Sequence, residues 1–143
     1  MKTTIFLRIA SIVALLQYSA HAVLFLSASP KHGAEEIALI ETMKSHTWNF
    51  AGSIHSYWNF YFGYGLLAIL WGLIEVVLLW QFATLSKPDP FRLRPVIFLI
   101  FIANIGHALL TLKYFFLLPA IFDFIIAALL GFAFIGAKKD MKI

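Results

Sequence analysis

Glu75 is the residue of this sequence whose type and surroundings most clearly point to chemistry. It is the only charged residue in the apolar stretch from about Phe60 to Ala83. An ionisable group inside such a stretch suggests a function, because charge is costly in hydrocarbon. The alternative is structural: a protonated or hydrogen-bonded carboxyl that ties its helix to Asn104 or to a snorkelling Arg8. Both interpretations stay open from the sequence.

His21 and His107 lie within two other apolar stretches and are the candidate cofactor ligands. Haem needs two facing histidines at matching depth, but a rise of about 1.5 Å per residue puts these two about 6 Å apart in depth. The spacing of His and acidic residues contains no convincing metal-ligand motif. We therefore expect no metal, no catalytic residue and no cofactor, with haem or a quinone as weaker alternatives.

The densest aromatic stretch runs from His46 to Gly65. Its Tyr and Trp residues are typical of a membrane interface, because one end of each side chain is apolar and the other forms hydrogen bonds. An aromatic belt does not explain the interleaved His55 and Asn59, which could line the mouth of a pocket that opens outward. The candidate ligand-binding residues of the whole chain are therefore His21, His55, Tyr61, Glu75, Asn104 and His107.

The elements that position these groups must be membrane helices. Hydrophobic residues make up 62% of the 143 residues and charged residues 13%, against about 45–50% and about 25% in soluble domains. A soluble domain of about 150 residues still exposes about a third of its chain's surface, so lipid has to cover this apolar excess. The absence of cysteine excludes disulfides, thiolate catalysis and cysteine-bound metal centres.

Four apolar stretches are long enough to span a hydrocarbon core, which takes about 20 residues. We expect an all-α, four-helix bundle forming one domain over 1–143, with helices at 5–26, 57–84, 95–117 and 119–137 and a turn near Pro119. Met1–Ala22 also fits a signal peptide that ends at Ala20-His21-Ala22, but we expect it to be retained as a helix. The outer loop, 27–56, should contain a short amphipathic helix over Gly33–Lys44, and 85–94 is the inner loop.

The distribution of Lys and Arg predicts the orientation, since short cytoplasmic loops are rich in both. With the N-terminus inside, the inner side carries Lys2, Arg8, Lys87, Arg92, Arg94, Lys138, Lys139 and Lys142. The outer side carries Lys31 and Lys44, with Lys113 near the outer surface. We therefore expect a multi-pass protein of the cell inner membrane with both termini in the cytoplasm. The basic residues lie at helix ends and form no patch for nucleic acid.

Small and polar residues recur at helical spacing in each stretch and predict the faces that pack together. These faces are Ala10, Ala14, Gln17 and His21; Tyr61, Gly65, Ala68, Gly72 and Glu75; Ile100, Asn104, His107, Thr111 and Tyr114; and Ala120, Asp123, Ala127 and Leu130. By depth, Glu75 should pair with Asn104, and Gln17 should share a level with His107. An ion pair between Lys113 and Asp123 could brace the last turn.

The segment Ser56-Tyr-Trp-Asn-Phe-Tyr-Phe-Gly-Tyr-Gly65 resembles the opening of the second helix in a family of small uncharacterised bacterial four-helix membrane proteins. Met43 and His46, in the Met-x-x-His spacing of that family's outer loop, and the run from Tyr114 to Pro119 are also similar. The resemblance covers nearly the whole chain. It implies the four-helix topology, and the family brings no assigned activity.

Two functions from different classes fit this sequence. The first is a non-enzymatic accessory or interaction subunit that packs against partners in a membrane complex, which needs no unusual chemistry. The second is a binding protein or enzyme for a lipophilic molecule such as a quinone, isoprenoid or lipid, which would explain Glu75 and the outer histidines. The first is narrowly favoured from sequence.

Overall fold

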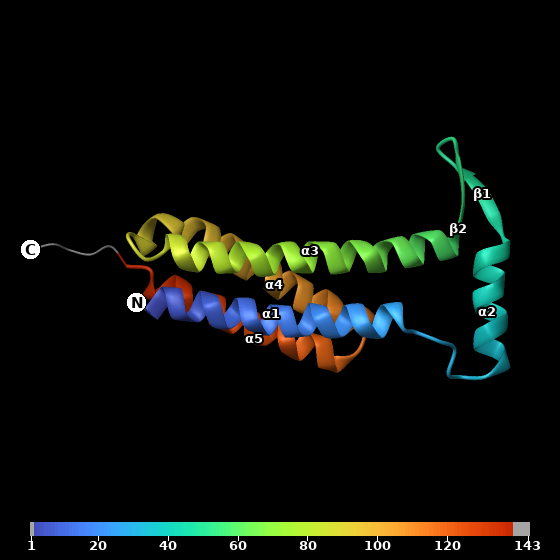
Figure 1. Ribbon diagram of the computed structural model, residues 1–143, viewed down its shortest axis with the longest axis horizontal. Helices are drawn as coiled ribbons and strands as arrows, with labels where there is room; N and C mark the ends of the chain where they lie inside the picture. Colours follow the sequence, from blue (N-terminus) through green and yellow to red (C-terminus); the bar gives the residue numbers. More distant parts are fainter. Residues whose placement is uncertain (1, 139–143) are drawn as a thin grey trace, which may run out of the picture. The chain divides into compact units, whose positions relative to one another are not determined.

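The computed structural model describes residues 2–138, so Met1, Lys139 and Lys142 lie outside the described residues. Its elements follow one another along the chain (Figure 1) as α1 (Lys2–Leu26), α2 (Ala34–Ser45), β1 (Thr47–Phe50), β2 (Ser53–Ser56), α3 (Tyr57–Leu85), the 3-10 helix η1 (Pro90–Leu93), α4 (Arg94–Tyr114) and α5 (Leu117–Gly136). Within residues 2–138, α1, α3, α4 with η1, and α5 are long and apolar enough to cross a membrane. The four predicted helices and the outer helix are thereby confirmed.

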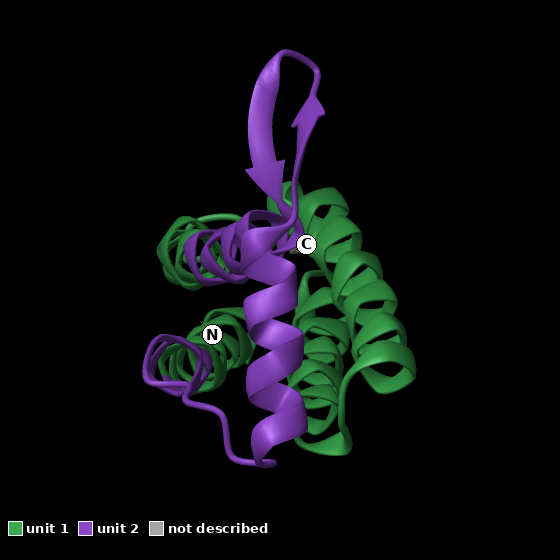
Figure 2. Cartoon of the chain, turned by 90° about the vertical axis from the view of Figure 1, so that its right-hand side faces the viewer, with its two compact units in different colours: residues 1–19, 72–143 green, residues 20–71 purple. Residues whose placement is uncertain are grey.

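The chain forms two compact units (Figure 2). Unit 1 comprises residues 1–19 and 72–143, and unit 2 comprises residues 20–71. The long helices α1 and α3 contribute to both units, because Ser19 and Gly72 lie within them. The single domain expected over 1–143 stays a prediction.

Small residues build the core of unit 1. Ala10 and Ala14 of α1 are buried, as are Ala120 and Ala127 of α5. Side chains of this size let helix backbones approach closely, which is how apolar helices gain contact when lipid competes for their surfaces. The predicted packing faces of α1 and α5 are therefore confirmed within this unit.

The predicted face of α4 is right at Asn104 and Thr111, which are buried, and wrong at His107 and Tyr114, which are exposed. The buried face passes from Asn104 through Ala108 to Thr111. The residue that follows Asn104 on the buried face is therefore Ala108, four positions on. The predicted face had His107, three positions on, in that place. Either step is compatible with a helix, and the one observed leaves the imidazole outside the core.

Hydroxyl groups link α1 to α3 and to Ser86, the residue that follows α3, in unit 1. The Oγ1 of Thr4 and the Oγ of Ser86 are 2.8 Å apart, and the Ser86 hydroxyl also donates to the carbonyl of Ala83. Farther along α1, Ser11 donates to the carbonyl of Val76 at 2.8 Å. Such bonds suit apolar helices, because they satisfy polar groups without charge.

Two glycines of α3 lie against aromatic rings of α1. A Cβ at Gly72 would overlap the ring of Tyr18 in unit 1, and a Cβ at Gly65 would overlap the ring of Phe25 in unit 2. A side chain at either position would have to displace the ring, whereas glycine leaves that space to it. The predicted close helix contacts at Gly65 and Gly72 are confirmed.

The connection between α4 and α5 lies earlier in the chain than predicted and is two residues long, Phe115 and Phe116, in place of one. Helix α4 ends at Tyr114 and α5 begins at Leu117, so the predicted helix bounds at 117 and 119 are wrong by two to three residues. The backbone N–H of Phe115 bonds to the carbonyl of Thr111 and closes α4. Pro119 lies in the first turn of α5, where a helix needs no N–H donor. The proline marks the start of the helix and not the turn before it.

Unit 2 contains a β-hairpin that the sequence analysis did not predict. Strands β1 and β2 pair antiparallel, with Phe50 opposite Ser53. The two turn residues, Ala51 and Gly52, both have positive φ, as a two-residue type I′ turn requires. The side chain of Asn49 accepts the N–H of Gly52 at 2.8 Å. Strands of four residues are too short for a reliable alternating pattern.

The start of α2 provides a prediction about pH. The carboxylate of Glu36 accepts the backbone N–H groups of His32 and Lys31, at 2.7 and 2.6 Å, and these bonds lower the pKa of Glu36 below its ordinary value. A lowered pKa means that the bonds stabilise the loop above the ordinary pKa and are lost as the pH falls through the lowered one. We expect the NMR shifts of the two amide protons to titrate below the ordinary glutamate range. In Glu36→Gln they should not titrate, and a midpoint at or above that range would contradict the assignment.

Candidate functional site

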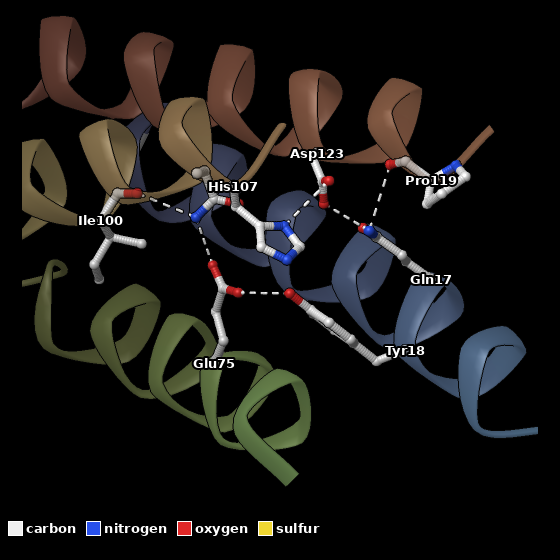
Figure 3. Close-up of polar contacts among 8 residues, drawn as sticks. Gln17, Tyr18, Glu75, Ile100, His107, Pro119 and Asp123 are labelled. Atoms are coloured by element: carbon white, nitrogen blue, oxygen red, sulfur yellow. Dashed lines mark hydrogen bonds and ion pairs between the residues drawn. The ribbon is translucent and has the colours of Figure 1, made fainter. Parts of the chain in front are cut away.

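Six polar side chains from four helices meet in unit 1 (Figure 3). We call them the polar cluster: Gln17 and Tyr18 of α1, Glu75 of α3, Asn104 and His107 of α4, and Asp123 of α5. Two carboxyl groups, one imidazole, one phenol and two amides are therefore gathered within helices that are otherwise apolar. The cluster has two halves, one around each carboxyl.

Glu75 is the centre of the first half. The side-chain amide of Asn104 donates to Oε1 of Glu75 at 2.6 Å and to the carbonyl of Ile100 at 3.1 Å. The hydroxyl of Tyr18 donates to Oε2 of Glu75 at 3.3 Å. Both carboxyl oxygens therefore have partners on neighbouring helices, and the predicted tie between Glu75 and Asn104 is confirmed.

Arg8 was the alternative partner of Glu75. Its guanidinium lies 5.0 Å from the ring centroid of Trp80, a cation–π contact. Its Nε is buried without a hydrogen-bond partner among the described residues. The charge of Arg8 is therefore placed against an aromatic face on α3.

Asp123 is the centre of the second half and is 0% exposed. Gln17 donates from Nε2 to Oδ1 of Asp123 at 2.6 Å and to the carbonyl of Pro119 at 3.4 Å. The other oxygen, Oδ2, has no hydrogen bond of good geometry and lies 3.1 Å from Nδ1 of His107. Because both reach Asp123, Gln17 and His107 share a level, as the helical rise predicted.

The predicted ion pair between Lys113 and Asp123 is wrong. Asp123 is enclosed by Gln17 and His107. The Nζ of Lys113 lies 5.0 Å from the ring centroid of Tyr114. Lys113 stands in the last turn of α4, where a cation also interacts favourably with the helix dipole.

His107 is the open member of the polar cluster. Its side chain is 52% exposed, although its partner Asp123 is fully enclosed. Its other ring nitrogen, Nε2, makes no hydrogen bond to the residues that the structure describes. His107 lies seven residues before the end of α4 at Tyr114, about 10 Å along the helix axis. An exposed imidazole therefore lies on the surface of an apolar helix, well away from the end of that helix.

The other three candidate ligand-binding residues belong to unit 2. The ring of His21 stacks on Phe25 with centroids 5.7 Å apart, and Tyr61 contacts the same phenylalanine at 6.0 Å. His55, on β2, lies 5.9 Å from the ring of Phe60. The six candidates are thus divided: Glu75, Asn104 and His107 belong to the polar cluster, and His21, Tyr61 and His55 pack against phenylalanines in unit 2.

Three members of the cluster, Gln17, Tyr18 and Asp123, are not among the candidate residues predicted from the sequence. Asp123 was assigned to a structural ion pair, although a carboxyl flanked by apolar residues on α5 is the same signal that drew attention to Glu75. Gln17 was placed on a packing face and given no further role. Tyr18 lies one residue off that face, and nothing in its spacing marks it.

The side chains of the polar cluster interact with one another mainly through hydrogen bonds. Among residues 2–138, no group of three or more His, Cys, Asp or Glu side chains lies close enough together to bind a metal ion. Five of the six cluster side chains, all except His107, direct their polar groups to other protein groups, through the contacts described above. What remains for a bound molecule is the exposed edge of His107.

The fold and the cluster define a class: a helical chain with four helices of membrane-spanning length and two carboxyl groups, each in contact with polar side chains of neighbouring helices. Comparisons with protein-family models, with curated proteins and with solved structures find no match.

Proposed function

We propose that this chain is a multi-pass protein of the bacterial inner membrane with both termini in the cytoplasm. Four helices of spanning length support insertion. Lys87 and Arg92 lie between α3 and α4, and Arg94 is the first residue of α4, on the side assigned to Lys2. Their positive charge supports a cytoplasmic position for that loop.

Cysteine labelling tests this orientation directly, because the chain has no cysteine of its own. Both Glu35 on α2 and Lys87 after α3 are exposed. In intact cells, we expect a membrane-impermeant maleimide to label Glu35→Cys but not Lys87→Cys. After permeabilisation it should label both. The reverse pattern would overturn the orientation.

We propose that the protein binds a lipophilic small molecule whose polar head contacts the polar cluster. The exposure of His107 is the observation that supports this function. In hydrocarbon, an uncovered polar group costs several kcal/mol, roughly, because no water is present to bond it. Some polar partner must therefore cover the imidazole, and a molecule that reaches it through the bilayer must itself be lipophilic.

The alternative is an accessory subunit in which a helix of another protein covers the same face. One feature favours it: only Gly72, Leu79 and Ala83 are buried in the 29 residues of α3. A helix so little covered leaves a large apolar surface for a partner. Lipid acyl chains cover such an apolar surface equally well, however. They have no hydrogen-bonding group for the imidazole of His107. We therefore place ligand binding first.

Purification in a mild detergent separates the two functions. A ligand-binding protein should carry an extractable lipophile in about equal molar amount and run as one polypeptide. An accessory subunit should instead co-purify with other polypeptides and yield only bulk phospholipid. Recovery of neither a lipophile nor a partner would overturn both proposals.

Glu75→Gln provides a prediction about the occupied half of the cluster. The glutamine oxygen can still accept from Asn104, and its amide can donate to Tyr18, so we expect thermal stability to change by less than about 1 kcal/mol. Retention of the lipophile should also be unchanged, because both oxygens of Glu75 already have protein partners. Loss of the lipophile at unchanged melting temperature would instead show that Glu75 contacts the ligand.

A further inference from the structure

The donor and acceptor pattern of the polar cluster restricts the chemistry of the molecule that covers His107. Both oxygens of Glu75 are engaged by Asn104 and Tyr18. The Oε1 of Gln17 has no hydrogen-bond partner among the described residues, but it is buried and closed to a ligand. His107 is the member of the cluster with an open polar edge. The ligand chemistry then depends on whether Nε2 of His107 donates or accepts a hydrogen bond.

The buried carboxyl of Asp123 determines the protonation of Nε2 of His107. An unbalanced charge in an apolar interior is strongly disfavoured, so the pair of Asp123 and His107 must be neutral as a whole. In one neutral form, an imidazolium faces a carboxylate, and both ring nitrogens carry hydrogen. In the other, the carboxyl carries its proton on Oδ2, because Oδ1 already accepts from Gln17. It then donates from Oδ2 to Nδ1, and the ring hydrogen is on Nε2. Both forms therefore leave an N–H at Nε2.

We propose that His107 donates a hydrogen bond from Nε2 to an acceptor on the bound molecule, which is a lipophile with a carbonyl-type head such as a ketone, quinone or ester. This inference rests on the proposed ligand-binding function. A carbonyl oxygen satisfies the N–H and brings no hydrogen of its own. An alcohol also accepts, but its own hydrogen then needs an acceptor. An amine or ammonium head would place a second donor against the imidazole.

A matched set of probes tests the head group, because only the head differs. Pentadecan-2-one, pentadecan-2-ol and pentadecane are added separately to delipidated protein in detergent, and the melting temperature is followed with concentration. Binding to the folded state raises that temperature, and the rise grows with the logarithm of the ratio of probe concentration to Kd. We expect the ketone to bind at least tenfold more tightly than the alkane, with the alcohol in between.

His107→Phe keeps a ring of similar size but removes the donor, so the ketone should lose its advantage and bind like the alkane. His107→Gln restores an N–H donor and should recover part of it. His32→Phe, an exposed position between α1 and α2, is the matched control and should bind all three probes as wild type does. If His107→Phe does not fold, the imidazole ¹⁵N spectrum of the unaltered protein serves instead: the ketone should shift one Nε2 resonance, and the alkane should not.

The possible failures can be distinguished. If ketone and alkane bind equally, or if His107→Phe leaves the preference intact, the acceptor assignment is wrong while lipophile binding stands. If no probe raises the melting temperature and no lipophile is extracted from the native protein, the proposed function is wrong and this inference with it.

Discussion

Asp123→Ala is expected to lower the stability of the folded protein by roughly 2–4 kcal/mol, from two polar contacts worth about 1–2 kcal/mol each between apolar helices. The change removes the acceptor of the Gln17 amide and the partner of His107. The Gln17 amide would keep only its long bond to the Pro119 carbonyl, and His107 would lose its partner. A polar group that loses its partner in an apolar setting costs more than an absent pair does. The measurement is the melting temperature in detergent, together with the fraction that stays monodisperse.

Asp123→Asn and Glu41→Ala complete this test. Asparagine keeps the shape of the side chain and an oxygen for Gln17, so it should recover most of the loss. Glu41 pairs with Lys44 on the exposed surface of α2, and surface pairs contribute only about 0–1 kcal/mol. If Asp123→Ala were as mild as Glu41→Ala, the cluster around Asp123 would not stabilise the bundle.

Gly72→Leu is expected to destabilise the protein by roughly 1–3 kcal/mol, the usual cost of overpacking a well-filled contact. The new side chain would occupy the space of the Tyr18 ring. Displacing that ring would also move its hydroxyl away from Glu75. We therefore expect a lower melting temperature and a change in the tyrosine environment, measured by near-ultraviolet circular dichroism.

Gly63→Leu is the matched control for Gly72→Leu. Gly63 lies on the same helix, and a Cβ there would have no neighbour within 4 Å. Leucine also favours a helix over glycine by somewhat less than about 1 kcal/mol, so this variant should be neutral or slightly more stable. Equal losses at Gly63 and Gly72 would mean that α3 does not tolerate leucine generally, and the contact with Tyr18 would lose its support.

The helices and one half of the polar cluster could be predicted from sequence for the same reason. Apolar length determines where a spanning helix can form, and the constant helical rise aligned Glu75 with Asn104 before any contact was known. Both inferences use distances along a helix axis, which vary little among proteins.

The other half depends on rotation about the axis, which the sequence determines less closely. The steps from Asn104 to His107 and to Ala108 differ by one residue, or about 100° around the helix. Only the packing of α4 against α5 selects between them. The same uncertainty explains why the partner of Asp123 was not predicted. Lys113 and His107 both precede the turn between α4 and α5 closely enough to reach Asp123, and the sequence did not indicate which of them faces it. The hairpin turn at Ala51 and Gly52 was missed for another reason, its short flanking strands.

In the membrane protein proposed above, the short link at Phe115 and Phe116 affects how the chain would enter the bilayer during synthesis. His107 and Asp123 stand on the two arms that this link joins. If the arms enter the bilayer together, acid and base can neutralise each other within the entering segment. Glu75 belongs to the earlier helix α3, so its hydrogen bond to Asn104 can form only after α4 has been synthesised. We therefore expect α3 to be held longer by the insertion machinery than the pair that follows it.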